Sequence, residues 1–324
     1  MQVFQSLEQF EEYFGPAGAS GADRPKTVVA LGNFDGVHIG HVEIIRSAVS
    51  YARETGAVPV CYTFSNHPRN MHIDIEGGEE PKVKLIATEA DKLALIEALG
   101  IDVCLSVPFD ETVMGTPAEA FVQDTLYGQL HADAVCCGFN YRFGARAAGD
   151  VDLLRSEGAK YGIKVIAHDA VTVDGEVVSS TAVRELIRQG DMERCAAYLG
   201  RPYSLSGKIV YGNEIGRKIG FPTANFEAGH IMMLPPNGVY FSNTIVGAEK
   251  YHGITNIGTK PTIGNYIKSV ETNLFGFHGD LYGKRIRVEL LHHSRPEMKF
   301  KNIYDLETQI ESDVRDARAF HGME

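Results

Sequence analysis

The chain has 324 residues, which is long enough for two domains of ordinary size, each with its own core. Hydrophobic residues make up 44% of it, which excludes a disordered chain. The formal net charge of -11 argues against a nucleic-acid partner, because phosphate backbones are bound by basic surfaces.

No apolar run approaches the roughly 20 residues that a membrane-spanning helix needs, so we expect no membrane partner. Residues 1–8 are neither basic nor continuously apolar, and we therefore expect no signal peptide. Nothing in the sequence selects an oligomeric state. The cysteines have no C-x-x-C spacing and are interpreted as small buried hydrophobic residues of a cytoplasmic, reducing compartment: Cys61, Cys104, Cys136, Cys137 and Cys195.

Strands and helices alternate from Thr27 to about Val178. Apolar runs predict strands at 27–31, 58–63, 103–107, 134–137 and 164–166, with helices between them. This alternation predicts an α/β domain with a parallel sheet and helices on both faces, which binds ligands at the C-terminal ends of its strands. The G-x-G-x-x-G pattern is absent, so we do not expect NAD.

A glycine-rich stretch, Leu31–His41, joins the first strand to a helix. His38 and His41 are three residues apart and lie on one face of the first helical turn. A helix N-terminus offers free N–H groups to phosphate, and two imidazoles beside it can hold or protonate phosphate oxygens. Gly32, Gly36 and Gly40 leave room for a nucleotide. Taken alone, this pattern fits a plain strand-to-helix turn with two incidental histidines better.

Three further segments end at the same predicted edge of the sheet: Thr63–Pro68, Gly138–Gly144 and Ser179–Arg184. The last begins a helix with hydroxyl groups and an arginine, which suit a triphosphate. Taken alone, an ordinary N-cap followed by an amphipathic helix explains that segment better.

The stretch Gly32–His41 resembles the signature of HxGH nucleotidyltransferases. It is most similar to the adenylyltransferase half of the bacterial bifunctional riboflavin kinase/FAD synthetases, and the other three segments resemble that half in the same order. The resemblance implies a Rossmann-like domain and catalytic roles for His38, His41 and Arg184. It also implies nucleotide contacts from Gly32, Phe34, Asp35, Gly36, Gly40, Asn140, Ser180 and Thr181.

The chain departs from the family pattern after the second strand. Ser65 and Asn66 stand where the family usually has an acidic residue and a proline. His67 remains, and we interpret it as structural rather than catalytic.

The pattern changes at Tyr203. Two short helices that end at Gly190 and Gly200 come first. Six strands are then expected near 203–211, 222–226, 238–246, 250–257, 269–275 and 284–291, which predicts a small six-stranded antiparallel β-barrel. An apolar stripe from Leu306 to Ala317 predicts a C-terminal helix packed on the barrel. We place the domains at 1–186, for FMN adenylylation, and 187–324, for riboflavin phosphorylation.

The densest stretch of the second half is Gly212–Asn225. Its glycines can turn N–H groups toward a phosphate, and Arg217 and Lys218 add positive charge. Thr223 and Asn225 are two residues apart, so on an extended segment both oxygens point the same way, and such oxygens suit Mg²⁺. A basic surface loop before a barrel strand accounts for the stretch equally well.

This stretch resembles the riboflavin kinase signature, whose Pro-Thr-Ala-Asn segment contacts Mg–ATP. The resemblance implies nucleotide contacts from Gly216, Lys218, Gly220, Thr223 and Asn225, the last two also as metal ligands.

Glu271 is the candidate base of the second half. An acidic residue in an apolar strand is usually solvent-facing, but a kinase needs a carboxylate to accept the proton of the attacking hydroxyl. The family pattern has a glutamate here, while Asn273 stands where histidine is common and receives no role. Ser294–Phe300 resembles the segment that closes over the flavin, which implies flavin contacts from Arg295 and Glu297.

The resemblance runs from about Phe4 to Ala319 and predicts a bifunctional enzyme. The second half would phosphorylate riboflavin with Mg–ATP to FMN, and the first would adenylylate FMN with a second ATP, giving FAD and pyrophosphate. One alternative is an HxGH transferase for another substrate, which leaves Thr223, Asn225 and Glu271 without a role. The other is a non-enzymatic flavin-binding regulator, against which the histidines and Glu271 argue.

Overall fold

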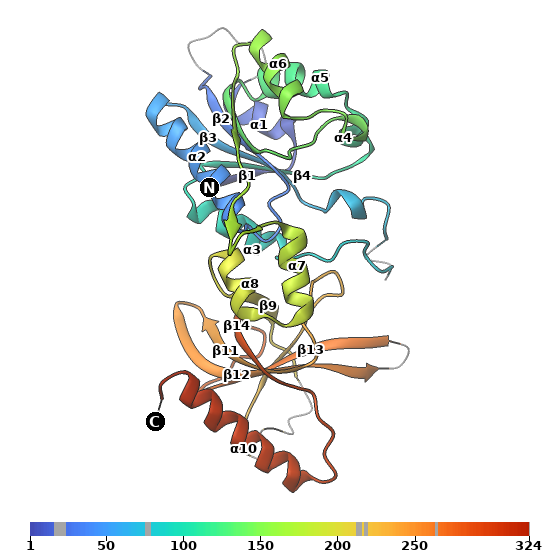
Figure 1. The fold of residues 1–324 in the computed structure, drawn as a ribbon, viewed down its shortest axis with the longest axis vertical. Coiled ribbons are helices and arrows are strands. Elements are labelled where there is room, and N and C mark those ends of the chain that lie inside the picture. Colours follow the sequence, from blue (N-terminus) through green and yellow to red (C-terminus); the bar gives the residue numbers. More distant parts are fainter. Residues whose placement is uncertain (16–23, 75–78, 212–215, 217–219, 263–264, 324) are drawn as a thin grey trace. The chain divides into compact units, whose positions relative to one another are not determined.

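The structure is a computed structural model that describes residues 1–15, 24–74, 79–211, 216, 220–262 and 265–323 (Figure 1). Contacts divide the chain into two compact units. The first comprises Met1–Val83 and Glu89–Ser179, and the second comprises Lys84–Thr88 and Ser180–Glu324.

The first unit contains a six-stranded sheet in the order β1-β4-β3-β2-β5-β6. Every neighbouring pair is parallel, which confirms the predicted parallel sheet. Its strands are β1 (Gln2–Phe4), β2 (Thr27–Leu31), β3 (Val58–Phe64), β4 (Val103–Val107), β5 (Ala132–Gly138) and β6 (Lys164–His168).

Helices cover both faces of this sheet, as predicted (Figure 1). Val28 faces a core that includes Ile45 and Ile96, whereas the next residue, Val29, faces the other core, because side chains alternate along a strand. The first core involves α2 (Ile39–Thr55) and α3 (Glu89–Ala98), and the second involves α1 (Leu7–Phe14), α5 (Ala118–Ala120), the π-helix η2 (Phe121–Gln129) and α6 (Val151–Lys160). The remaining elements are η1 (Pro68–Asn70), α4 (Glu111–Gly115), η3 (Ala145–Ala147) and the hairpin β7 (Thr172–Val173) and β8 (Glu176–Val177).

The cysteines are all buried and free, as expected. Cys136 and Cys137 face the two different cores, as adjacent strand residues must.

The second unit begins with α7 (Ser180–Gln189) and α8 (Met192–Leu199), and Gly190 and Gly200 follow them with φ of 78° and 70°. Its sheet has the order β10-β13-β12-β11-β14-β9 with antiparallel pairs throughout. A bridge between Val210 and Asn225 links its two edges, so the predicted barrel is nearly closed. The strands are β9 (Tyr203–Lys208), β10 (Ala224–Glu227), β11 (Gly238–Val246), β12 (Glu249–Thr262), β13 (Asn265–Leu274) and β14 (Arg285–Pro296).

The C-terminal helix α10 (Ile303–Phe320) packs on the barrel, as predicted. Its Ala317 and Val314 share a cluster with Phe241 of β11 and Ile254 of β12. This helix therefore covers one outer face of the sheet (Figure 1).

A short segment of the first half, Lys84–Thr88, belongs to the second unit. The backbone N–H of Leu85 donates to Ile231 O at 2.8 Å, and the N–H of Met233 donates to Leu85 O at 2.7 Å. The sequence pattern did not predict this segment's partners, because they are more than a hundred residues away.

Candidate active sites

The turn between β2 and α2 has an unusual backbone. Phe34 and Val37 have φ of 51° and 40°, and Gly36 between them has φ of 76°. A positive φ is strained for a β-branched residue such as Val37, and such strain gathers at functional sites. Phe34, Asp35 and Val37 are all buried, so the packing around the turn holds this conformation.

His38 and His41 meet at the start of α2. His38 is the N-cap of the helix, and its Nδ1 accepts the backbone N–H of His41 at 3.3 Å. The two imidazoles stack with 3.6 Å between centroids. Because Nδ1 of His38 is an acceptor, a neutral His38 carries its proton on Nε2. The structure thus brings the two predicted catalytic histidines together and sets the tautomer of one.

The glycines of this turn make room for aromatic rings. A Cβ on Gly32 would lie 2.9 Å from the Phe34 ring, and one on Gly40 would lie 3.3 Å from the His38 ring. The small size of Gly32 and Gly40 therefore makes room for the rings of Phe34 and His38. The contacts of these glycines with a nucleotide stay predictions.

The loops that follow β3 and β5 begin at the same edge of the sheet as this turn, because the strands are parallel. Thr63 Oγ1 donates to Asn33 O at 3.0 Å and fixes the turn to the end of β3. Asn140 is exposed two residues after β5.

Asn66, which departs from the family pattern, and His67, which keeps it, both have structural partners. Asn66 bonds both backbone groups of Phe109, donating to its O at 3.1 Å and accepting its N–H at 2.7 Å. His67 caps η1 by accepting the N–H of Arg69 at 3.2 Å, which supports a structural role.

The predicted phosphate-binding residues of α7 lie in the second unit. Ser180 and Thr181 form its first turn, and Arg184 Nε donates to Lys84 O at 2.7 Å. The assignment of these residues to one site with His38 and His41 stays a prediction.

The register of the barrel places four polar residues in one cross-strand row. Asn225 pairs with Glu271, Glu271 with Asn256, Asn256 with Val239, and Val239 with Arg295. Side chains of directly opposite residues share a face of the sheet. The structure therefore aligns the predicted metal ligand, the predicted base and a predicted flavin contact across five strands.

Asn256 is the member of this row that sequence reasoning missed. It lies in a predicted strand, but its position beside Glu271 depends on strand pairing, which the local pattern does not contain. The row is on the face that α10 covers, because Phe241 and Ile254 are two residues from Val239 and Asn256.

Hydrogen bonds hold the segment before β10. Asn225 Nδ2 donates to Thr223 Oγ1 at 3.2 Å, and Asn273 Nδ2 donates to Pro222 O at 2.6 Å. Gly216 accepts the N–H of Phe221 at 2.8 Å, and a Cβ on it would overlap the Phe221 carbonyl, while Gly220 has φ of 81°. Lys218, predicted to contact the nucleotide, lies outside the described residues.

The two predicted flavin contacts have different surroundings. Arg295 Nε donates to both carboxylate oxygens of the buried Asp313 of α10, at 2.9 and 3.1 Å. Glu297 is exposed, and its Oε2 accepts from Asn237 Nδ2 at 3.0 Å. Arg295 therefore anchors α10, whereas Glu297 reaches solvent at the end of β14.

Residues 21–182 match the family model for FAD synthetase, and residues 199–321 match the one for riboflavin kinase. The chain is 33% identical over 293 residues to the bifunctional riboflavin kinase/FMN adenylyltransferase of Haemophilus influenzae, covering 90% of this chain and 93% of that protein. This chain belongs to the bifunctional riboflavin kinase/FMN adenylyltransferase family.

Two further comparisons also match this chain over nearly its full length. The bifunctional riboflavin kinase/FMN adenylyltransferase of Bacillus subtilis is 35% identical over 301 residues, which is 91% of this chain and 92% of that one. A crystal structure of a macrolide-efflux protein from Streptococcus pneumoniae superposes with a TM-score of 0.81 at 26% identity and covers 96% of both chains. The family's FAD synthetase part thus precedes its riboflavin kinase part here.

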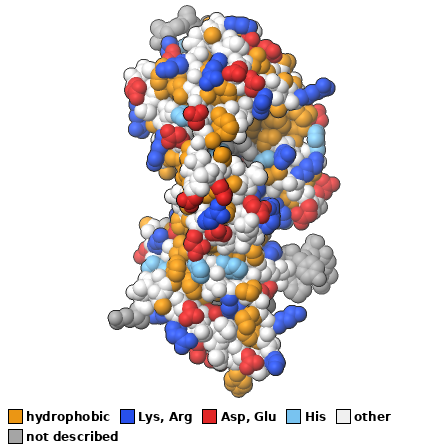
Figure 2. All heavy atoms as spheres, viewed as in Figure 1, with side chains coloured by type: hydrophobic (Ala, Val, Ile, Leu, Met, Phe, Trp, Pro, Cys, Tyr) orange, Lys and Arg blue, Asp and Glu red, His pale blue; other side chains and the backbone are white. Residues whose placement is uncertain are grey.

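Within the described part of this family member, no helix is long and apolar enough to cross a membrane. Acidic and basic side chains are interspersed over the face in Figure 2.

The donor atoms at Thr223 and Asn225 fit the Mg²⁺ expected for the kinase reaction. The Thr223 hydroxyl and the Asn225 amide are adjacent, and both offer neutral hard oxygens. Among residues that the structure describes, no three His, Cys, Asp or Glu side chains gather into a metal site. A metal held by Thr223 and Asn225 would therefore take its remaining oxygens from phosphate and water, as Mg²⁺ prefers.

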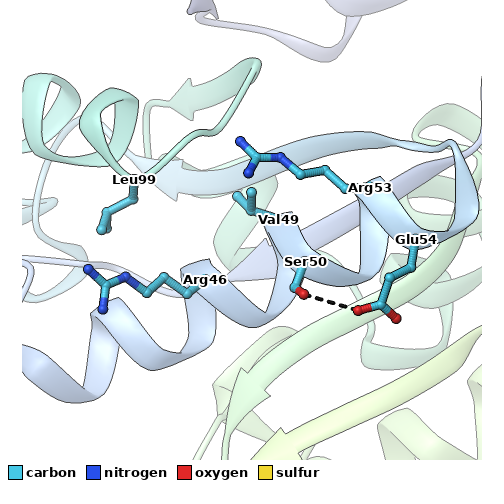
Figure 3. A pocket seen from close by; sticks show the side chains of 6 residues that line it. All are labelled: Arg46, Val49, Ser50, Arg53, Glu54 and Leu99. Carbon is cyan, nitrogen blue, oxygen red and sulfur yellow. Dashed lines mark hydrogen bonds between the residues drawn. The ribbon is translucent and has the colours of Figure 1, made fainter.

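Two surface hollows are lined by neither the paired histidines nor the residues of the barrel row. One, of about 460 Å³, is lined by Leu99 and five residues of α2 and contains no predicted site residue (Figure 3). The other, of about 340 Å³, lies between Phe221 and α10. Pro222 follows Phe221 in the sequence, and its carbonyl oxygen accepts the hydrogen bond from Asn273.

Proposed function

We propose that the two reactions of the family use two separate groups of residues, in domains 1–186 and 187–324. The observation that carries the kinase assignment is the cross-strand row that aligns Asn225, Glu271 and Arg295. Residues so distant in sequence share a row only through the fold of the barrel.

In the kinase reaction, the 5′-hydroxyl oxygen of riboflavin attacks the γ-phosphorus of ATP. A new O–P bond forms, the bond to the β,γ-bridging oxygen breaks, and ADP leaves. Glu271 orients the hydroxyl and accepts its proton. Strands on both sides hold its backbone, and its cross-strand neighbours are Asn225 and Asn256.

Thr223 and Asn225 would hold Mg²⁺ together with ATP, and the ion would offset negative charge on the phosphates. The hydrogen bond from Asn225 Nδ2 to Thr223 Oγ1 holds the two side chains next to each other. Asn273 supports this pair through its bond to Pro222 O.

In the adenylylation, the FMN phosphate oxygen attacks the α-phosphorus of a second ATP and pyrophosphate leaves. His38, His41 and the N-terminus of α2 stabilise the negative charge that develops. A neutral His38 donates through Nε2, because Nδ1 accepts the N–H of His41. Ser180, Thr181 and Arg184 hold the departing phosphates, and no covalent intermediate is required.

The substrates and products of this enzyme are riboflavin, FMN, FAD and ATP. We infer a cytoplasmic location, because all five cysteines are buried and free, as in a reducing compartment.

The test is incubation of the purified chain with riboflavin, Mg²⁺ and ATP, followed by separation of the flavins. We expect FMN first and FAD later. An HxGH transferase for another substrate would form neither flavin product, and a regulator would bind flavin without converting it. Either result would refute the proposal.

A further inference from the structure

We propose that Asn237 is a positioning residue for riboflavin, because its side-chain amide joins Glu297 to two strands of the barrel. The inference rests on the proposed kinase function. It concerns a residue just before β11, outside every segment that the sequence pattern singled out.

One amide group connects three other parts of the second unit. Asn237 Nδ2 donates to Thr259 Oγ1 of β12 at 3.1 Å and to Glu297 Oε2 at 3.0 Å. Its Oδ1 accepts from Nζ of Lys268 of β13. An asparagine amide has two N–H donors and one carbonyl acceptor, so both kinds of atom are in use.

These contacts restrain a carboxylate that would otherwise be mobile. Glu297 is exposed, and fixing a free glutamate side chain on ligand binding costs rotamer entropy. Thr259 and Lys268 are cross-strand partners, so the amide that holds Glu297 is itself anchored on paired strands. Lys268 adds a positive charge that attracts Glu297, although burial lowers the pKa of its ammonium group.

The restrained Glu297 carboxylate lies close to the cross-strand row that contains Glu271. A Cβ on Gly258 would be 3.2 Å from Glu297 Oε1 and 3.3 Å from Asn256 Nδ2, so both groups approach one point above that glycine. Asn256 is the cross-strand partner of Glu271. A flavin held by Glu297 is thereby placed one strand from the base.

The test is Asn237→Asp in the full chain. The new carboxylate has nearly the same shape but cannot donate to Glu297 and repels it. We expect the KM for riboflavin to rise about tenfold, equivalent to about 1.4 kcal/mol, with little change in kcat or in the KM for ATP. The Kd for riboflavin without ATP, from flavin fluorescence, should rise by the same factor. FMN adenylylation in the same sample should be unchanged.

Asn243→Asp is the matched control. Asn243 is also a barrel asparagine that donates to a carboxylate, Glu289 at 3.4 Å, but it touches no proposed site residue. Its substitution should leave the KM for riboflavin unchanged.

Unchanged riboflavin KM and Kd in Asn237→Asp would overturn the proposal, as would a fall in kcat alone or an equal effect of Asn243→Asp. If Asn237→Asp does not fold, Thr259→Val gives the same test, with an expected rise in KM of about threefold from one lost partner. No change there would also overturn it. Failure of the wild-type chain to make FMN would instead refute the proposed function.

Discussion

Glu271→Gln offers the sharpest test of the kinase site. Glutamine keeps the size of the side chain and its place in the row, because the backbone of residue 271 pairs with β10 on one side and β12 on the other. The amide, however, cannot accept the proton of the riboflavin hydroxyl. We expect the kinase rate to fall by about 10²–10⁴-fold, the usual contribution of a general base. A fall of 10² corresponds to about 2.7 kcal/mol of activation free energy.

The assay measures FMN formation from riboflavin at saturating ATP, and FAD formation from supplied FMN in the same preparation. The second rate should be unaffected, because Glu271 is assigned only to the kinase. Glu289→Gln is the control, since Glu289 is a barrel glutamate paired with Lys250 at 3.1 Å and lies outside the proposed site. A loss below about threefold in Glu271→Gln would rule Glu271 out as the base.

Three further outcomes are expected. His38→Ala should accumulate FMN while FAD output falls at least about tenfold, and equal FAD output in a time course would remove His38 from the adenylylation site. Asp313→Asn should lower the free energy of unfolding of the second unit by about 3 kcal/mol in urea titrations, because the Arg295 guanidinium loses its buried partner; an unchanged midpoint would contradict this. Burial, followed by the neighbouring His252, lowers the pKa of His321, so the unfolded chain takes up that proton first and stability is lost as pH falls below about 6.5. His321→Gln should therefore flatten the decline in unfolding free energy between about pH 7 and 5, and an equally steep decline would exclude the assignment.

The alternating strands and helices of the fold were predicted well from the sequence. The strand Thr27–Leu31 was predicted with the bounds that the structure has, because a buried parallel strand is a short apolar run between turn residues. The first strand and helix, Gln2–Phe4 and Leu7–Phe14, were not predicted. Three residues are too few to show an alternating pattern, and the strand exists only through its pairing with β4.

The candidate sites also contain some features that the sequence predicted and others that it could not predict. The two histidines are three residues apart, so helix geometry alone placed them together. The position of Asn256 beside Glu271, the bond from Arg295 to Asp313 and the three partners of Asn237 all require strand register and tertiary packing. Sequence spacing does not encode these distances, which is why the predicted flavin contact Arg295 proved to have a buried partner on α10.

The segment Lys84–Thr88 has a consequence for how such enzymes can be recombined. The chain passes between the two units three times, at Val83/Lys84, Thr88/Glu89 and Ser179/Ser180. A gene fusion can replace the kinase part by a single crossover near residue 180. The segment Lys84–Thr88 then stays in the N-terminal part that is retained. The backbone groups of Ile231 and Met233 are then separated from Leu85, and the residues that replace these two face a segment from a different protein. Grafting the kinase part onto another protein therefore calls for carrying two pieces of sequence, or for redesigning the edge that Leu85 covers.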